Sequence, residues 1–336
     1  MKKKGLSCVL AALLLVLGTG CGSTLTSDGK SDVSSAETKK VVLNEVAHSI
    51  FYAPMYVAIE NDYFKEHGID LELVTGFGAD KTMTAVLSGE ADIGFMGPET
   101  TVYTSNEGAT DIVVNFAQLT QRAGNFLVAR EPDTDFSWEK LKGTEVLGGR
   151  DGGMPEMVFE YILKKNGIDP EADLKIDKSI DFGSTAAAFS GGQGDYSVEF
   201  EPGATALEKE GAGYVVASLG VDSGYVPYTA FSAKDSYMKE NPDVIKGFVA
   251  AMKQGMEYVT SHTPEEIAAV LAPQFPDTDA ETLATIIKRY ADQDTWKTDL
   301  VFEESAYDLL LDILEEAGQL SERPAYEKLV TTEYVK

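Results

Sequence analysis

The feature that most constrains the fold is an alternation of strand and helix signals between residues 41 and 98. A short apolar run at 41–43 predicts a strand, and Pro54 then begins a helix, at a position where its missing N–H costs nothing. Gly68 follows the last helical turn and can take the left-handed conformation that ends a helix. A second strand is predicted at 69–74. Strand–loop–helix–strand units of this kind bind ligands at the loop that follows the first strand.

The same order of signals then repeats. Aromatic and aliphatic residues recur at helical spacing after Pro54, which predicts one helix with a buried face formed by Tyr56, Ile59, Tyr63 and Phe64. Another helix is predicted at 79–87 and another strand at 91–96, ending in Gly97-Pro98. Two such units in succession indicate an α/β protein.

The rest of the chain continues this pattern and then changes character. Strand signals lie at 111–117, 125–129, 144–147, 174–176, 195–198, 214–218 and 228–233, and the segment at 118–124 is polar and irregular. From Asn241 onward almost every signal is helical, at 241–260, 263–271, 279–290 and 303–317. Thr263, Pro264 and Glu266 form a good helix start.

These signals predict two α/β lobes with a central cleft and a C-terminal helical segment. We expect lobe 1 to comprise residues 41–123 and 231–336 together with the C-terminal helices, and lobe 2 to comprise residues 124–230. The chain is expected to cross between the lobes near 123–130 and again near 228–233. Because ligands of open parallel sheets bind outside the carboxyl ends of the strands, the loops at those ends are expected to line the cleft.

The N-terminal segment is typical of an exported protein. Lysines at 2–4 precede an apolar core at 9–17, which is too short to be a confident membrane span. The segment resembles a bacterial lipoprotein signal with Cys21 as the lipidated residue, although Gly18 replaces the usual large aliphatic residue. The alternative is an ordinary secretory signal in which Cys21 is incidental. We expect a signal peptide at 1–20, a disordered tether at 21–40, and an extracytoplasmic protein anchored to the cell membrane by lipid.

The charge of the chain excludes one class of partner. The formal charge is -27, and removing the first 20 residues takes away three lysines and no acid, which leaves the mature chain near -30. A surface this acidic repels phosphate backbones, so we expect no binding of nucleic acid.

Three motifs resemble those of the solute-binding proteins of ABC importers, in the branch that serves nitrate, sulfonate, taurine and thiamine-pyrimidine precursors. They are Phe51-Tyr52-Ala53-Pro54-Met55-Tyr56-Val57-Ala58, Tyr63-Phe64-Lys65-Glu66-His67-Gly68-Ile69-Asp70-Leu71 and Leu87-Ser88-Gly89-Glu90-Ala91-Asp92-Ile93-Gly94-Phe95. The resemblance covers roughly residues 41–330. It implies the type II periplasmic-binding fold, lobes that close on a small-molecule solute, and delivery to a permease and its ATPase. We expect a monomer without a cofactor or metal.

Residues at the predicted strand ends are the candidate ligand contacts. From lobe 1 they are His48, Phe51, Tyr52, Gly78, Met96, Glu99 and Gln118, and from lobe 2 they are Arg150, Asp151, Gly153, Met154, Glu199 and Glu201. Several of these residues also have ordinary structural interpretations. His48 can be a satisfied structural histidine, Glu99 can stabilise a helix N-terminus, and Arg150 can pair with a neighbouring acid. Glu199 and Glu201 alternate, so on a strand end they are expected to share a face.

The chemistry of these loops favours a neutral or cationic heteroaromatic solute. Aromatic rings offer stacking surfaces, and carboxylates accept hydrogen bonds from amino or ring N–H groups. Basic groups are scarce, with Arg122 and Arg150 the only two in these loops. Our hypothesis is an aminopyrimidine-type thiamine precursor. A sulfonate, taurine or nitrate remains the alternative, because Gly152, Gly153 and Met154 could supply bare N–H groups to an anion.

An enzyme of this architecture is a further alternative, because a related eukaryotic family makes the thiamine pyrimidine on the same fold with an active-site histidine and iron. The three histidines of this chain, His48, His67 and His262, lie far apart in sequence. The sequence contains no cysteine cluster, metal-ligand pair or nucleophile elbow. We therefore expect a binding protein and no catalytic residues.

Overall fold

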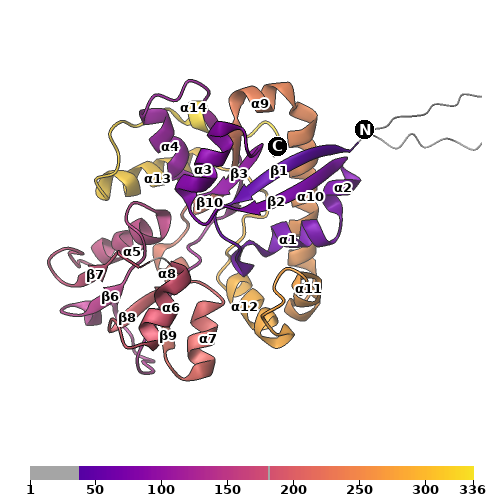
Figure 1. Cartoon of the computed structure of the whole chain (residues 1–336). Coiled ribbons are helices and arrows are strands. Elements are labelled where there is room, and N and C mark those ends of the chain that lie inside the picture. Colours follow the sequence, from indigo (N-terminus) through magenta and orange to yellow (C-terminus); the bar gives the residue numbers. More distant parts are fainter. Residues whose placement is uncertain (1–37, 181) are drawn as a thin grey trace, which may run out of the picture. The chain divides into compact units, whose positions relative to one another are not determined.

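The computed structural model describes residues 38–180 and 182–336, and these residues form two five-stranded sheets with helices packed against them (Figure 1). We keep the name lobe 1 for the first sheet with its helices, and lobe 2 for the second. The proposed signal peptide, the tether and Cys21 lie outside the described residues.

The sheet of lobe 1 has the strand order β2-β1-β3-β10-β4. Its strands are β1 (Lys39–Glu45), β2 (Ile69–Thr75), β3 (Ile93–Met96), β4 (Val113–Thr120) and β10 (Thr229–Lys234). β1 pairs in parallel with β2 and β3, whereas β10 runs antiparallel between β3 and β4. The start of β10 therefore lies at the ends of β3 and β4, so this edge of the sheet is where the chain enters and leaves lobe 2.

The sheet of lobe 2 has the order β7-β6-β8-β5-β9. Its strands are β5 (Phe126–Ala129), β6 (Glu145–Leu147), β7 (Lys175–Asp177), β8 (Tyr196–Glu199) and β9 (Tyr214–Ser218). Here β5 runs antiparallel to both β8 and β9. β4 of lobe 1 ends at Thr120 and β5 begins at Phe126, and β9 ends at Ser218 before β10 begins at Thr229, so two connections join the sheets.

The helices follow the sheets in chain order. Lobe 1 carries the 3-10 turn η1 (Ile50–Tyr52), α1 (Ala53–Glu60), α2 (Tyr63–Glu66), α3 (Ala79–Ser88) and α4 (Glu99–Asn106). Lobe 2 carries η2 (Trp138–Leu141), α5 (Met154–Lys165), α6 (Phe182–Ser190), α7 (Gly203–Glu210) and α8 (Leu219–Ser223). The C-terminal segment forms α9 (Asp235–Glu240), α10 (Pro242–Ser261), α11 (Pro264–Leu271), α12 (Ala280–Asp292), α13 (Glu304–Glu316) and α14 (Tyr326–Leu329). None of the helices in the described ranges is both long and apolar enough to cross a bilayer.

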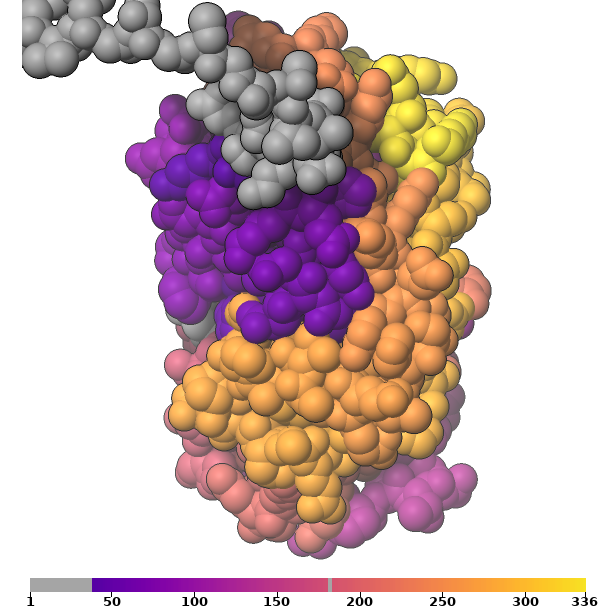
Figure 2. All heavy atoms as spheres, turned by 90° about the vertical axis from the view of Figure 1, so that its right-hand side faces the viewer, coloured from indigo at the N-terminus to yellow at the C-terminus, as the bar shows by residue number. Residues whose placement is uncertain are grey.

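The C-terminal helices contact both lobes. α10 and α11 pack on α1, so segments far apart in the sequence lie side by side, and Figure 2 shows the orange part of the chain beside the purple part of lobe 1. α13 packs against α5 of lobe 2. The predicted capping box at the start of α11 is confirmed, because the Thr263 side chain accepts from the Glu266 N–H while the Glu266 side chain accepts from the Thr263 N–H.

Three local features differ from what the sequence predicted or left open. The single helix expected from Pro54 to Phe64 is two helices, because Asp62 adopts a left-handed conformation with φ 59° and separates α1 from α2. β4 continues to Thr120 through the segment expected to be irregular, since its polar residues are buried and pair with β10. A helix, α4 (Glu99–Asn106), begins at Glu99, where the sequence left a helix N-terminus as one of two interpretations.

Candidate functional site

The N-terminus of α4 places an acidic side chain where lobe 1 faces lobe 2. After β3 the chain turns through Gly97 and Pro98, and α4 begins at Glu99, whose side chain is 2% exposed. No described residue supplies a hydrogen-bond partner for its Oε2. Burial raises the pKa of Glu99 to about 8, while the backbone N–H groups of Glu99 itself and of Met154 in lobe 2 act in the opposite direction. Glu99 is therefore a buried carboxyl group beside the start of α5 with unused hydrogen-bonding capacity.

One turn further along α4, Tyr103 makes a direct bond between the lobes. Its hydroxyl donates to the Gly152 carbonyl oxygen at 3.1 Å and lies 3.6 Å from the sulfur of Met157. Because Glu99 and Tyr103 are four residues apart, they share one face of α4. That face is thus the surface of lobe 1 that meets the start of α5.

A second contact between the lobes involves loops that follow β2 and β6. The Arg150 Nη1 atom lies 3.6 Å from Asp80 Oδ1 at the start of α3. Arg150 also lies close to Gly78, because a side chain at position 78 would place its Cβ atom 3.3 Å from Arg150 Nη1. The structure therefore brings together Gly78 and Arg150, which were predicted as contacts from opposite lobes. Asp151, beside Arg150, is mostly exposed and lies 3.3 Å from Lys178.

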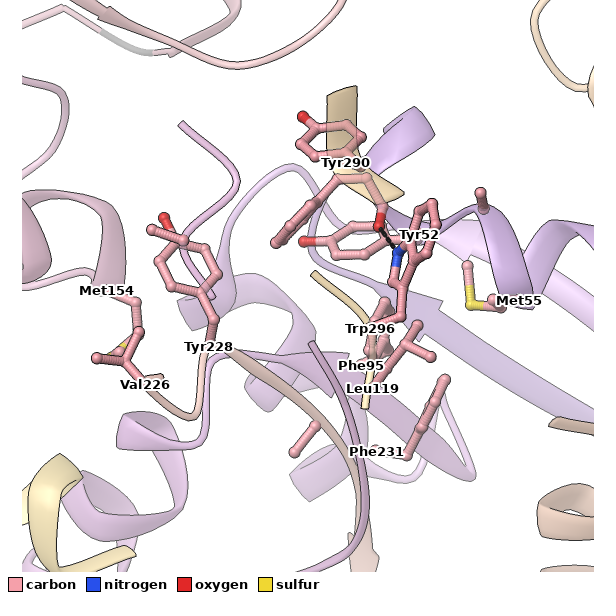
Figure 3. Packing of buried hydrophobic residues seen from close by; sticks show 14 of the residues in the cluster. Tyr52, Met55, Phe95, Leu119, Met154, Val226, Tyr228, Phe231, Tyr290 and Trp296 are labelled. Carbon is pink, nitrogen blue, oxygen red and sulfur yellow. Dashed lines mark hydrogen bonds between the residues drawn. The ribbon is translucent and has the colours of Figure 1, made fainter. Parts of the chain in front are cut away.

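Aromatic side chains form one wall of this region. Tyr52 packs edge-on against Phe95 with ring centroids 4.5 Å apart, and Phe51 packs edge-on against Tyr228 at 5.6 Å. Figure 3 shows Tyr228 near Met154 of lobe 2 and Tyr52 near Tyr290 of α12. These rings come from lobe 1, from the second connection and from α12, and all are at least nine-tenths buried.

Two further side-chain amides near the connections have unused polar atoms. Gln118, near the end of β4, donates from Nε2 to the Thr120 carbonyl, and its Oε1 has no partner among the described residues. Asn125, at the first connection, accepts from the Tyr228 hydroxyl at 2.5 Å, and its Nδ2 has no partner in the described part of the chain. Burial raises the pKa of Tyr228, and the charges of Tyr52 and Glu99 act in the same direction.

His48 has structural partners at both ring nitrogens. Nδ1 contacts Glu45 Oε1 at 2.9 Å, Nε2 contacts the Gln274 carbonyl at 2.9 Å, and the ring stacks on Phe275. The hydrogen bond with Glu45 raises the pKa of His48. Glu45 also accepts from the Tyr56 hydroxyl at 2.6 Å. His48 thus belongs to a network that joins the end of β1 to the C-terminal helices.

The two acidic residues at the end of β8 do not share a face as predicted. Glu199 accepts from Thr185 at 3.0 Å and from Ser197, and burial raises the pKa of Glu199 to about 7. Glu201 lies beyond the end of the strand, where the alternation of side chains no longer holds. Its carboxylate binds Thr205 and the guanidinium of Arg289 in α12, so it holds lobe 2 to the C-terminal helices.

Met96 and Gly153 also have clear places in the fold. Met96 is 1% exposed and belongs to a small core between α3 and the sheet of lobe 1. Gly153 is the N-cap residue of α5. It has no side chain that could accept a hydrogen bond from the backbone N–H groups in the first turn of that helix.

Tyr103, Asn125 and Tyr228 were not among the contacts predicted from the sequence. Tyr103 could have been found from its spacing of four residues after Glu99, if the helix start considered at Glu99 had been extended by one turn. Asn125 and Tyr228 are two residues of the connections between the sheets, and only the pairing of the strands shows that these connections lie together. Among the described residues, no cluster of histidine, cysteine or acidic side chains has the composition of a metal site.

Two α/β lobes joined by two connections, with a buried polar site between them, define the class of two-lobed binding proteins with the periplasmic-binding-protein type II fold. Solved structures share this fold with the chain. The alkanesulfonate-binding protein SsuA from Xanthomonas axonopodis pv. citri, bound to MOPS, superposes with a TM-score of 0.71 at 14% identity over 88% of this chain and 99% of that chain. The ligand-binding component of an ABC-type import system from Staphylococcus aureus, with zinc bound, gives 0.70 at 15% identity over 89% and 98%.

The family is shown by sequence. The model of the NMT1/THI5-like family matches residues 50–267, and the chain belongs to that family. The putative binding protein YtlA of Bacillus subtilis (strain 168) is 44% identical over 321 residues, which cover 95% of this chain and 96% of the relative. A putative binding protein of Brucella abortus (strain 2308), BAB2_1146, is 24% identical over 69% of this chain and 70% of the relative. The chain is therefore a binding protein rather than an enzyme, as its sequence predicted.

Proposed function

We propose that the chain is the extracytoplasmic solute-binding component of an ABC importer, and that it captures a small organic solute by closing its two lobes. The observation that carries this proposal is the position of Glu99, a buried carboxyl group on lobe 1 that faces the start of α5 on lobe 2 with Oε2 unpartnered among the described residues. A buried polar atom without a partner costs free energy, which a bound solute recovers by hydrogen bonding. Only a closed form lets the solute contact both lobes, so the solute selects closure.

The chemistry of the site supports an aminopyrimidine-type solute of the kind found in thiamine precursors. Glu99 Oε2 and Gln118 Oε1 can accept hydrogen bonds from an amino group, and Asn125 Nδ2 can donate one to a ring nitrogen. Tyr52 and Tyr228 offer aromatic faces in the same region. A flat ring that carries both amino donors and a ring acceptor matches this combination.

The alternative solute is a small anion such as a sulfonate, taurine or nitrate. The first turn of α5 is the place for it, but the N–H of Met154 already faces Glu99 and the N–H of Gly152 donates to Glu156 Oε2 at 3.2 Å. A carboxyl group at this helix start competes with any solute anion for the same N–H groups. We therefore place the anion second.

Binding measurements with defined probes test the choice. Calorimetry and thermal shift with the hydroxymethyl aminopyrimidine of thiamine, with taurine and with ethanesulfonate should show binding of the pyrimidine alone. Glu99→Gln should weaken pyrimidine binding about tenfold, because it removes one of the two carboxyl oxygens, and a hydrogen bond contributes roughly 0.5–1.5 kcal/mol. Glu107→Gln, at the exposed end of the same helix, is the matched control and should bind like the wild type. Tight binding of taurine that survives Glu99→Gln would reverse the order of the two solutes.

We also propose that Cys21 is lipidated, that the lipid keeps the binder beside its permease and ATPase, and that the protein acts as a monomer. Two acyl chains suffice for stable anchoring, since each buried CH₂ contributes about 0.8 kcal/mol. Tethering raises the local concentration of the binder at the transporter. Cys21→Ser should move the protein from the membrane fraction to the soluble fraction of expressing cells. Unchanged membrane association would contradict the anchor and leave the solute assignment intact.

A further inference from the structure

The loop before α5 is held from two sides. On the side of lobe 1, the Gly152 carbonyl oxygen accepts the hydrogen bond from the Tyr103 hydroxyl at 3.1 Å. On the side of lobe 2, the Gly152 N–H donates to Glu156 Oε2 at 3.2 Å. Glu156 is the third residue of α5 and reaches back to the backbone as the acidic residue of a capping box does. The position of Gly152 therefore depends on where the Glu156 carboxylate is fixed.

Lys178 fixes that carboxylate. Its Nζ atom binds Glu156 Oε1, lies 2.7 Å from Glu160 Oε1, and lies 3.3 Å from Asp151 Oδ1. Glu156 and Glu160 are 3% and 9% exposed and stand one turn apart on α5, so they repel each other without a cation between them. Lys178 comes from the loop after β7 and is the cation that lies between these two carboxylates.

The ionisation of Glu156 shows why the lysine matters. Burial and the neighbouring Glu160 carboxylate raise the pKa of Glu156 to about 7, while Lys178 lowers it. Lys178 therefore favours the ionised form of the Glu156 carboxyl group. A neutral carboxyl group is a weaker acceptor for the Gly152 N–H, because charge-assisted hydrogen bonds are the stronger ones.

We propose that Lys178, acting through Glu156, positions Gly152 to receive Tyr103, and so sets how tightly lobe 2 closes on the solute. Lys178 is a positioning residue in this scheme. Its role goes through a chain of three contacts: Lys178 to Glu156, Glu156 to Gly152, and Gly152 to Tyr103. The inference rests on the proposed function only for its last step, the grip on the solute.

The first arm of the test needs no solute. Hydrogen exchange of the full-length protein, followed by mass spectrometry of peptides that span residues 150–157, reports how firmly the Gly152 loop is held. Lys178→Met should exchange at least tenfold faster there, and Lys178→Arg, which can bridge both carboxylates, should restore the wild-type rate. Lys175→Met is the matched control, since Lys175 forms an exposed pair with Glu145 and should leave exchange unchanged.

A second variant keeps the test decisive if Lys178→Met does not fold. Glu156→Ala removes the acceptor of the Gly152 N–H and leaves Lys178 with Glu160 and Asp151. It should produce the same fast exchange. Wild-type exchange in either Lys178→Met or Glu156→Ala overturns the proposal.

The second arm measures affinity for the aminopyrimidine probe in a double-mutant cycle. Lys178→Met and Tyr103→Phe should each weaken binding about fivefold, and the double variant should be little weaker than either single variant, because both break one chain of contacts. Additive losses would show that Lys178 acts by another route and overturn the proposal. If no probe binds, the assignment of the solute fails, while the exchange arm still decides the role of Lys178.

Discussion

At the scale of the residue, Glu99 has the environment least suited to its charge. It is a carboxyl group that is 2% exposed, and burial raises its pKa from 4.5 to about 8. The folded state therefore binds this proton more tightly than the unfolded state does. The stabilisation of the folded state by this bound proton is complete below pH 4.5, the pKa of Glu99 in the unfolded chain. It is lost as the pH rises through about 8, the pKa in the folded state.

This linkage predicts how Glu99→Gln changes the pH dependence of stability. The wild type should lose unfolding free energy between about pH 5 and pH 8.5, and the variant, which has no proton to lose, should lose roughly 4 kcal/mol less, since about three pKa units lie between pH 5 and the folded pKa of about 8 and each corresponds to about 1.4 kcal/mol. Urea unfolding at several pH values measures the difference. Glu107→Gln, which is exposed, should follow the wild-type curve. Parallel curves for Glu99→Gln and the wild type would mean that Glu99 is not buried in its neutral form.

At the scale of the element, the crossing of α10 over α1 depends on a missing side chain. A Cβ atom on Gly255 would lie 2.3 Å from the Pro54 carbonyl oxygen and 3.1 Å from Ala58 Cβ. Backbone atoms of a packed helix cannot move aside as the end of a long side chain can. The two helices would have to separate, and the aromatic residues of α1 would lose contacts in the core.

Gly255→Ala is therefore expected to lower the unfolding free energy by about 2 kcal/mol, the usual cost of overpacking, as measured by urea denaturation. Gly183→Ala in α6 is the control, because no atom lies within 4 Å of a Cβ atom there. It should be neutral or stabilising by up to about 1 kcal/mol, since alanine suits a helix better than glycine. A loss in Gly255→Ala no larger than the change in Gly183→Ala would contradict the close approach of the helices.

Elements with strong local signals were the ones that the sequence predicted. The start of α11 is specified by Thr263, Pro264 and Glu266 within four residues, and the structure confirms its capping box. The sequence left α4 only as one interpretation, because its N-cap residue, Pro98, provides no side-chain cap and the apolar period of the helix is weak. The break between α1 and α2 was missed, since Asp62 adopts a left-handed conformation that aspartate takes only occasionally and that a glycine would have signalled more strongly.

At the scale of the whole molecule, Arg289 joins lobe 2 to the C-terminal helices. Its guanidinium binds Glu201 at 2.5 Å and Glu208 at 2.8 Å, and it lies over the Phe126 ring at 5.2 Å. The side chain of Glu201 is fully buried, so its charge has little access to water. Removing the arginine leaves that charge uncompensated.

Arg289→Met should lower the unfolding free energy by about 3 kcal/mol, because breaking a buried ion pair costs roughly 3–5 kcal/mol and this arginine is partly exposed. Arg323→Met is the matched control. Arg323 pairs with Asp312 and Glu315 on the surface, where ion pairs contribute about 1 kcal/mol or less. Chemical unfolding of both variants measures the contrast, and equal losses would contradict a buried role for the Glu201 pair.

The sequence by itself determined the α/β class, the positions of most strands and helices, and the family motifs within residues 51–95. Such features depend on spacing, caps and turn residues within a few positions of one another, so a linear pattern is enough to find them. The tertiary structure decided which polar residues meet. Tyr103 and Gly152 are 49 residues apart, Glu201 and Arg289 are 88 apart, and Ser49, which donates to the Glu201 carbonyl, is 152 residues away from it. Burial and unpaired polar atoms arise only when such distant segments pack, and for that reason the exceptional environment of Glu99 could not be read from its neighbours in sequence.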